Sequence, residues 1–226
     1  EELAPDLIDI NLGCPKPKVT SKCEGGALLA DPGRALAIVR AACKASRVPV
    51  TAKLRLPDEF VLPEFIDFLR ALQDCGVAAL TLHPRTVAER FGGRARWEVF
   101  PALAPRLSVP LIASGDAKNA QDVRTLLGMG CAAVMIGRAA IGNPHIFREI
   151  LSDLEGRPAA PQPPAERLAL CLLLGRRLIR IAGQVVRKHV LRSKLAKQQR
   201  DRVAHVREHG RHQHDRDDAD DDTQDR

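Results

Sequence analysis

Five short apolar segments recur between residues 1 and 155, and each is followed by a turn and an amphipathic stretch. Strands that alternate with helices at this spacing predict βα units joined into a parallel sheet. Because the segments are apolar runs, we expect both faces of the sheet to be buried. The predicted strands are Leu7–Asn11, Val48–Leu54, Ala78–His83, Val109–Ser114 and Ala132–Gly137.

Helix signals between the predicted strands support the same repeat. Asp31 is placed to cap a helix that has Pro32 at its first position. Gly76 and Gly130 each stand where a helix can end in the left-handed conformation. The predicted helices are Pro32–Ser46, Pro63–Asp74 and Ala120–Met129.

Polar side chains stand at the end of every predicted strand, where α/β enzymes keep their chemistry. These residues are Asn11, Cys14, Lys53, Arg55, His83, Arg85, Ser114, Asp116 and Arg138. No Gly-x-Gly-x-x-Gly follows any strand, which argues against a dinucleotide-binding Rossmann sheet. The sequence therefore predicts an α/β fold of the (β/α)8 TIM-barrel type, incomplete, with about five βα units visible. Since a closed barrel needs eight units, we expect either that about three units are missing before the first strand or that the sheet stays open.

Cys14 and Asn11 lie at the turn that ends the first predicted strand. A thiol beside Gly13 on a tight turn is reachable and can act as an acid, a nucleophile or a redox group. The amide of Asn11 can offer both a donor and an acceptor to a planar amide such as uracil. Lys53 lies within a buried strand, where an amine requires an anion, and a cofactor is the natural one. The alternative for Lys53 is a charge that reaches solvent at the strand end.

The later strand ends carry groups suited to phosphate. His83 and Arg85 point to the same side of their strand and can bind phosphate or a substrate carbonyl. Arg85 could equally hold a neighbouring loop. Glycines let a ligand approach the backbone closely, and loop amides with a helix N-terminus bind phosphate in barrels. We therefore expect a phosphate site at Ser114-Gly115-Asp116 and Gly137-Arg138.

The positive charge of the chain is concentrated behind a proline-rich stretch. The net charge is +7, and residues 161–200 alone carry 10 basic residues and 1 acidic residue. Arg176, Arg180 and Arg187 share one face of the helix predicted there, which indicates either a solvated face or a surface for a polyanion, above all nucleic acid. The expected organisation is a barrel portion over 1–155, a linker over 156–164, a basic helical segment over 165–200 and a disordered polar tail over 201–226.

Composition narrows the setting of the protein. The six cysteines form no Cys-x-x-Cys pair, so neither a zinc ribbon nor a thioredoxin-type site is indicated, and we expect no metal site. No segment is apolar over the length that a membrane span needs, and no secretory leader opens the chain. We therefore expect a cytoplasmic protein, and no protein partner is predicted.

Seven ordered stretches of the chain resemble the tRNA-dihydrouridine synthase family, flavin enzymes that reduce uracil in tRNA. They are Ile8–Pro15, Gly25–Leu29, Val48–Leu56, Leu80–Thr86, Gly92–Trp97, Val109–Asp116 and Val134–Phe147. The resemblance implies a barrel that binds FMN, with NADPH as reductant, hydride transfer from reduced FMN to C6 of uracil, and a proton from Cys14 to C5. It also implies that FMN is bound by Lys53, His83, Ser114, Gly115, Asp116, Gly137 and Arg138. Uracil flipped out of its stack would be held by Asn11 and Arg85, and tRNA phosphates by Arg176, Arg180 and Arg187.

Two other functions remain open on the sequence alone. An FMN barrel that acts on a free pyrimidine would share the strand-end residues but has no need of the basic helix. An inactive truncated RNA-binding fragment would share the helix without a closed barrel. The chain also departs from the family pattern, with Cys23-Glu24 in place of a small Gly-Ala pair, Pro57 in place of a common glycine and Ser114 where asparagine is frequent.

Overall fold

The computed structural model describes residues 5–143, 145–157, 163–166, 168–170 and 172–173. The chain divides by its internal contacts into two units, Glu1–Pro163 and Pro164–Arg226. The described residues of the second unit are all helical. The first unit contains the sheet, and the fold below is that of this unit.

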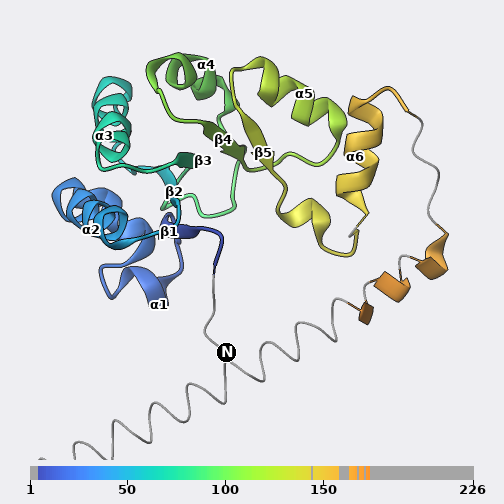
Figure 1. Cartoon of the computed structure of the whole chain (residues 1–226), viewed down its shortest axis with the longest axis horizontal. Coiled ribbons are helices and arrows are strands. Elements are labelled where there is room, and N and C mark those ends of the chain that lie inside the picture. Colours follow the sequence, from blue (N-terminus) through green and yellow to red (C-terminus); the bar gives the residue numbers. More distant parts are fainter. Residues whose placement is uncertain (1–4, 144, 158–162, 167, 171, 174–226) are drawn as a thin grey trace, which may run out of the picture. The chain divides into compact units, whose positions relative to one another are not determined.

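The first unit is built on a sheet of five parallel strands in the order β1-β2-β3-β4-β5 (Figure 1). Each strand pairs with the next strand in the chain, whereas a doubly wound sheet reverses its order at a switch point. The fold is therefore α/β of the TIM-barrel type, as predicted, with five successive units in the described residues. The strands overlap the predicted segments: β1 (Ile8–Leu12), β2 (Val50–Leu56), β3 (Ala79–Thr86), β4 (Leu111–Ser114) and β5 (Ala133–Met135).

Helices and short helical turns connect the strands. They are α1 (Pro17–Thr20), η1 (Gly25–Ala30), α2 (Pro32–Ala45), α3 (Leu62–Asp74), η2 (Trp97–Val99), α4 (Phe100–Leu103), η3 (Ala104–Arg106), α5 (Ala120–Gly128), η4 (Arg138–Ala140) and α6 (Ile146–Leu154). The predicted cap of α2 is confirmed, because Asp31 accepts a hydrogen bond from the backbone N–H of Arg34 at 3.0 Å. The predicted ends of α3 and α5 are confirmed as well, with Gly76 and Gly130 at φ of 97° and 90°.

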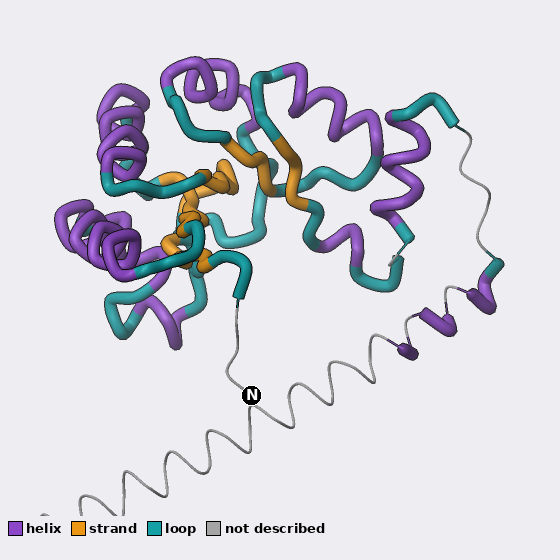
Figure 2. Tube along the Cα trace, viewed as in Figure 1, coloured by secondary structure: helices purple, strands orange, loops and turns teal. Residues whose placement is uncertain are grey.

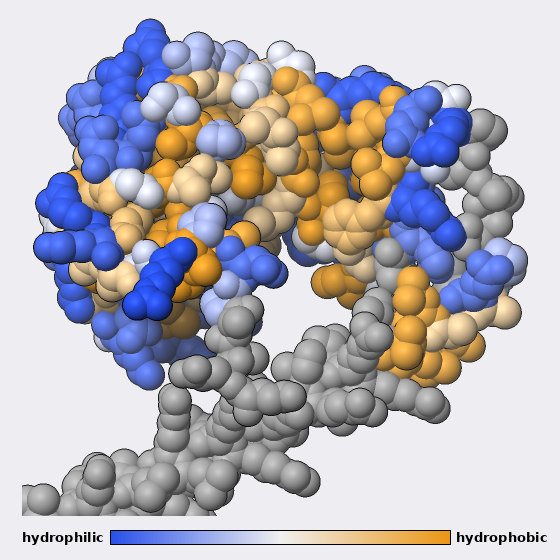
Figure 3. Space-filling model, viewed as in Figure 1, coloured by the Kyte–Doolittle hydropathy of each residue, from blue (hydrophilic) through white to orange (hydrophobic). Residues whose placement is uncertain are grey.

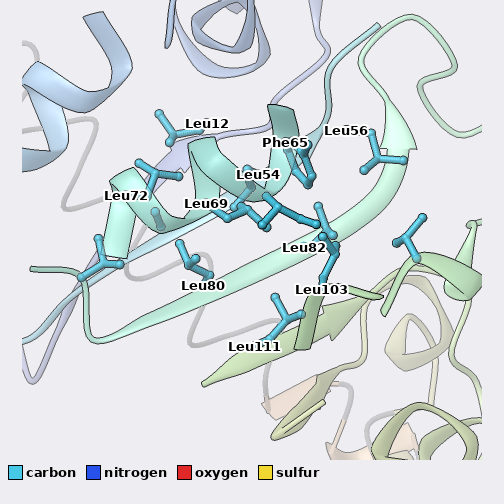
Figure 4. Close-up of a cluster of buried hydrophobic side chains, with 14 of the residues drawn as sticks. Leu12, Leu54, Leu56, Phe65, Leu69, Leu72, Leu80, Leu82, Leu103 and Leu111 are labelled. Atoms are coloured by element: carbon cyan, nitrogen blue, oxygen red, sulfur yellow. The ribbon is translucent and has the colours of Figure 1, made fainter. Parts of the chain in front are cut away.

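One face of the sheet is apolar and carries the helices. Leu12 pairs in register with Leu54, and Leu54 with Leu82, so these side chains share one face. Figures 1 and 2 show α2, α3, α4 and α5 along the outside of the strands. Figure 4 shows the resulting core, to which α3 contributes Phe65 and Leu69. Burial of leucine and phenylalanine side chains on this scale contributes roughly 1.5–3 kcal/mol each, before the loss of conformational entropy.

The opposite face of the sheet is polar, and the expectation that both faces are buried holds at β3 but not at β1. Asn11 pairs in register with Lys53, Lys53 with Thr81, and Arg55 with His83. Asn11 is exposed and Lys53 is half-buried. Successive side chains of a strand point to opposite faces. The helices therefore bury the leucines of β1 to β4 and leave the polar set on the other side.

The helix at the β5 end of the sheet is apolar on two sides. α6 packs against the rest of the unit through Ile146 and Ile150. Phe147 and Leu151 on the same helix are half or more exposed, and the nearby Ile141 is 81% exposed. Figure 3 shows this apolar surface beside α6 and hydrophilic residues over the outer helices α2 and α3. Within the described part of the chain, α6 thus buries one of its apolar sides.

Candidate active site

The predicted residues at the ends of β3, β4 and β5 meet at one edge of the sheet. Arg85, near the end of β3, forms two hydrogen bonds with the carboxylate of Asp116, after β4, at 2.9 Å and 2.7 Å. Arg138, after β5, donates to the same carboxylate at 2.8 Å. One carboxylate therefore joins the carboxyl ends of three neighbouring strands.

Arg85 is buried, with 2% of its side chain exposed, and each of its five N–H groups has a partner. Nε donates to the carbonyl of Gly92 and Nη2 to that of Gly93, both at 2.8 Å, while Nη1 contacts Nε2 of His83 at 3.0 Å. The remaining two bonds go to Asp116. A guanidinium has five donors, so none is left for a substrate. This geometry favours the alternative that Arg85 holds a neighbouring loop, and its contact with uracil stays a prediction.

Asp116 is saturated with donors from the chain. Besides its three bonds to arginines, its carboxylate accepts the backbone N–H of Ala95 at 2.8 Å. Burial opposes ionisation, but the bonds from Arg85 and Ala95 outweigh it and lower the pKa of Asp116. Any contact of this turn with a cofactor phosphate therefore falls to its backbone, since the side-chain oxygens are occupied.

His83 is buried beside Arg85 and held in one tautomer. A guanidinium only donates, so Nε2 of His83 accepts the bond from Arg85 and the ring proton lies on Nδ1. Burial, together with the charges of Arg55, Lys53 and Arg85, lowers the pKa of His83 to about 3. The ring is neutral at pH 7, and Nδ1–H is its donor. Gly115 leaves room for this ring, because a Cβ there would lie 2.6 Å from Cδ2 of His83.

Cys14 is half-buried in the turn after β1, and Asn11 shapes that turn. Oδ1 of Asn11 accepts the backbone N–H groups of Gly13 and Cys14 at 3.0 Å and 3.1 Å. Both lone pairs of this oxygen are thus used within the turn, which leaves the Nδ2 group of Asn11 as the donor toward a ligand. The structure supports the donor half of the predicted uracil contact and assigns the acceptor to the turn.

Two glycines pack directly against Cys14. The backbone N–H of Gly26 donates to the carbonyl of Cys14 at 3.0 Å. A Cβ on Gly25 would lie 3.0 Å from Cβ of Cys14, and one on Gly26 would lie 2.9 Å from the methyl groups of Val87. The turn η1 therefore packs against Cys14. The spacing of these glycines in the sequence does not predict this contact.

Lys53 and Arg55 place two positive charges on the polar face of β2. Burial and the charge of Arg55 lower the pKa of Lys53, although the carboxylate of Asp9 opposes the shift. Arg55 is buried and donates to the carbonyl of Arg90 at 2.6 Å. A half-buried ammonium with a lowered pKa fits the prediction that Lys53 lies where an anion binds.

Sequence reasoning placed Arg55 at a strand end without giving it a role, and it missed Phe91 as part of this region. The guanidinium groups of Arg55 and Arg138 lie 5.4 Å and 5.6 Å from the centroid of the Phe91 ring. The available signal for Arg55 is its place two residues after Lys53, which puts both on one face of the strand. Phe91 is a lone aromatic residue in a loop and gives no comparable signal.

A cleft of about 890 Å³ lies beside Cys14 rather than over the Arg85 bonds. Its walls come from the segments that follow β1, β2 and β3, and include Pro15, Gly26, Asp58 and Arg90. None of the described residues that line it is a predicted site residue. Its volume falls in the range of small-molecule sites.

Comparison with known proteins identifies the family. The chain matches the model of the dihydrouridine synthase family, Dus, over residues 1–225. The chain belongs to this family. It is 40% identical over 196 residues to tRNA-dihydrouridine synthase B of Klebsiella pneumoniae, an alignment that covers 84% of this chain and 61% of that protein.

Other relatives in the family agree. The tRNA-dihydrouridine synthase B of Escherichia coli strain K12 is 38% identical, again over 84% of this chain and 61% of that protein. A probable tRNA-dihydrouridine synthase of Treponema pallidum is 40% identical over 64% of this chain and 46% of that protein. The chain thus spans about 61% of the length of the first relatives that it matches.

Some of the remaining predictions concern described residues, and others lie outside them. Ser114 is buried and Gly137 is exposed, both at the strand ends where they are expected. The predicted tRNA contacts and the polar tail lie outside the described residues: Arg176, Arg180, Arg187 and 201–226. Across residues 5–143 and 145–157 and the short described helical stretches, no group of three metal-ligating side chains comes together. No helix in those same segments has the length and apolarity of a membrane span.

Proposed function

We propose that this chain forms part of an active site that reduces uridine to 5,6-dihydrouridine in tRNA, with FMN as bound cofactor and NADPH as reductant. The family match carries the proposal, and the curated relatives are named for this reaction. The Cys14 turn supports it, because a thiol and an amide donor lie together at the carboxyl end of a strand.

The donor set at the strand ends fits a flavin that carries a phosphate. Lys53 and Arg138 provide positive charge, and Arg138 keeps N–H groups beyond the one that bonds Asp116. Nδ1–H of the neutral His83 can donate to a phosphate or carbonyl oxygen without bringing a further charge. The residues that would hold FMN are Lys53, His83, Ser114, Gly115, Asp116, Gly137 and Arg138, with Asp116 acting through its turn.

Each group of the chain then has a defined task. FMN held there in its reduced form would supply the hydride for C6 of uracil. Cys14 holds the proton destined for C5, and Asn11 fixes the turn that carries the thiol by accepting the backbone N–H of Cys14. Asn11 donates from Nδ2 to a carbonyl oxygen of the base. The cleft whose walls include Pro15 and Gly26 adjoins the Cys14 turn.

The basic segment completes the proposal as the tRNA-binding element. Arg176, Arg180 and Arg187 would contact phosphates, where each cation that binds contributes affinity that falls with salt. A free pyrimidine needs no such surface, so tRNA is the favoured substrate over a small molecule.

The first experiment measures the visible absorption spectrum of the purified chain before and after FMN is added. Flavin uptake should be followed by NADPH oxidation and by the appearance of dihydrouridine in an unmodified tRNA transcript. Cys14→Ala should retain flavin and NADPH oxidation but lose dihydrouridine formation. Cys43→Ala, a change to a half-buried cysteine on α2, is the matched control and should behave as the unaltered chain. A Cys14→Ala chain with full tRNA activity would refute the role of the thiol.

A further inference from the structure

Arg85 is the most heavily bonded side chain at the strand ends, yet its bonds all go to the chain itself. We propose that Arg85 is a positioning residue, which fixes His83 as the Nδ1–H tautomer and locks the 92–95 loop and Asp116 onto β3. The edge proposed to bind the cofactor is then formed before the cofactor arrives. The flavin part of this inference rests on the proposed function, whereas the tautomer part does not.

The tautomer follows from the chemistry of the two partners. Neutral imidazole can carry its proton on either nitrogen, and the hydrogen bond at one nitrogen decides the other. Arg85 offers only N–H groups, and its Nη1 lies 3.0 Å from Nε2 of His83. Nε2 must therefore accept, and Nδ1 must carry the proton. With His83 only 7% exposed, water has little access to compete for the bond.

The same guanidinium ties the 92–95 loop to two strand ends. It donates to the carbonyls of Gly92 and Gly93 on one side and to the carboxylate of Asp116 on the other. Asp116 in turn accepts the N–H of Ala95, so the loop is bonded at both ends of its span. A lysine cannot reproduce this pattern, because it offers three donors around one atom rather than a planar fork of five.

Trp97 gives this unit its own optical reporter. It is the one tryptophan of the chain, and its indole N–H donates to the carbonyl of Gly115 at 3.0 Å. It follows the loop by two residues and bonds the residue before Asp116. A loop that separates from Asp116 should therefore change the Trp97 emission, since the indole loses a fixed partner.

The deciding experiment is nitrogen NMR of the ¹⁵N-histidine-labelled chain without added flavin. The ring signals of His83 are assigned by their loss in His83→Gln. We expect a protonated Nδ1 and an unprotonated Nε2 in the unaltered chain, and loss of this fixed pattern in Arg85→Gln and Arg85→Lys. A protonated Nε2 in the unaltered chain overturns the proposal without any arginine variant. The same fixed pattern retained in a folded Arg85→Lys chain also overturns it.

Two further readouts separate positioning from a general effect on folding. Trp97 emission should shift in Arg85→Lys and stay unchanged in Arg40→Gln, an exposed arginine on α2 that serves as the matched control. FMN affinity should fall about tenfold or more in Arg85→Lys, equal to ~1.4 kcal/mol, and not in the control. Unchanged emission and affinity in Arg85→Lys would refute the locking role. If the unaltered chain binds no FMN, the proposed function fails, while the tautomer still decides the role of Arg85.

Discussion

Replacement of Gly115 by alanine adds a single methyl group, which should disrupt the hydrogen bonds at the strand ends. The new Cβ would lie 2.6 Å from Cδ2 and 2.8 Å from Nε2 of His83, closer than real carbon contacts. Gly115 also has φ of 104°, a conformation that alanine adopts only under strain. Because β3 and the Arg85 bond hold the ring in place, the backbone of the turn has to move.

The size of the effect follows from two separate terms. A non-glycine residue in a sparsely populated backbone region costs roughly 1–3 kcal/mol. Overpacking of a filled site costs a further 1–3 kcal/mol, so the free energy of unfolding should fall by about 2–6 kcal/mol. For a chain of this length, that corresponds to a decrease in Tm of roughly 4–24 °C. Urea unfolding followed by Trp97 fluorescence measures it.

Gly128→Ala is the matched control for this substitution. Gly128 ends α5 with no atom within 4 Å of the position of its Cβ. Alanine there should be neutral or stabilise the helix by up to about 1 kcal/mol. Equal changes in stability for Gly115→Ala and Gly128→Ala would refute the contact argument. A destabilised Gly115→Ala with an unchanged His83 tautomer would show that strain acts without reaching the ring.

Three smaller predictions test the cap, the buried histidine and the support of the thiol. Asp31→Ala should lower the free energy of unfolding by about 1 kcal/mol, measured by urea unfolding, because the N–H of Arg34 loses its acceptor. The pKa of His83 lies near 3 in the fold against 6.5 when unperturbed, so the unfolded chain binds the extra proton between these values. Stability should therefore fall as the pH drops through this window, by up to about 1.4 kcal/mol per pH unit, and His83→Gln should flatten that slope. Gly26→Ala should slow alkylation of the nearby thiol or destabilise the chain, and Val87→Ala should partly rescue it by removing the methyl groups 2.9 Å away. A Gly26→Ala chain that matches the unaltered one on both measures contradicts the close approach.

The order of the strands could be predicted because each strand and helix is marked by local features of the sequence. Apolar segments, a capping Asp31 and terminal Gly76 and Gly130 need only neighbouring residues to act. The burial of the two faces was predicted correctly for β3 and wrongly for β1, where Asp9 and Asn11 are exposed. Whether a polar strand face is covered depends on what packs against it, which the sequence of one strand does not show.

The candidate site was predictable by position and less so by role. The carboxyl ends of parallel strands meet at one edge, so Arg85, Asp116 and Arg138 were expected near one another. Which partner each would take depends on the 92–95 loop, since its carbonyls compete with a substrate for the donors of Arg85. A loop conformation of this kind is set by tertiary contacts and leaves no periodic trace in the sequence.

The balance of charge at the strand ends leads to a last prediction. Arg85 and Arg138 share the carboxylate of Asp116, while Lys53 and Arg55 lie side by side on the same face of β2. Burial and the charge of Arg55 lower the pKa of Lys53, so its charged form is disfavoured in the chain alone. An anion bound near Lys53 would offset this penalty. It should therefore stabilise the fold by RT ln(1 + [L]/Kd), about 1.4 kcal/mol at tenfold excess over Kd.

Inorganic phosphate is the probe for this anion site. Tm should rise with phosphate concentration, and it should rise less with chloride at the same ionic strength. Lys53→Met should lose most of the phosphate-dependent rise, whereas Lys44→Met, at an exposed lysine on α2, should keep it. An equal rise in both variants would show that phosphate acts through general exclusion from the protein surface. The cations of the strand ends would then be balanced by the chain's own carboxylates, and the case for an anion site beside Lys53 would fall.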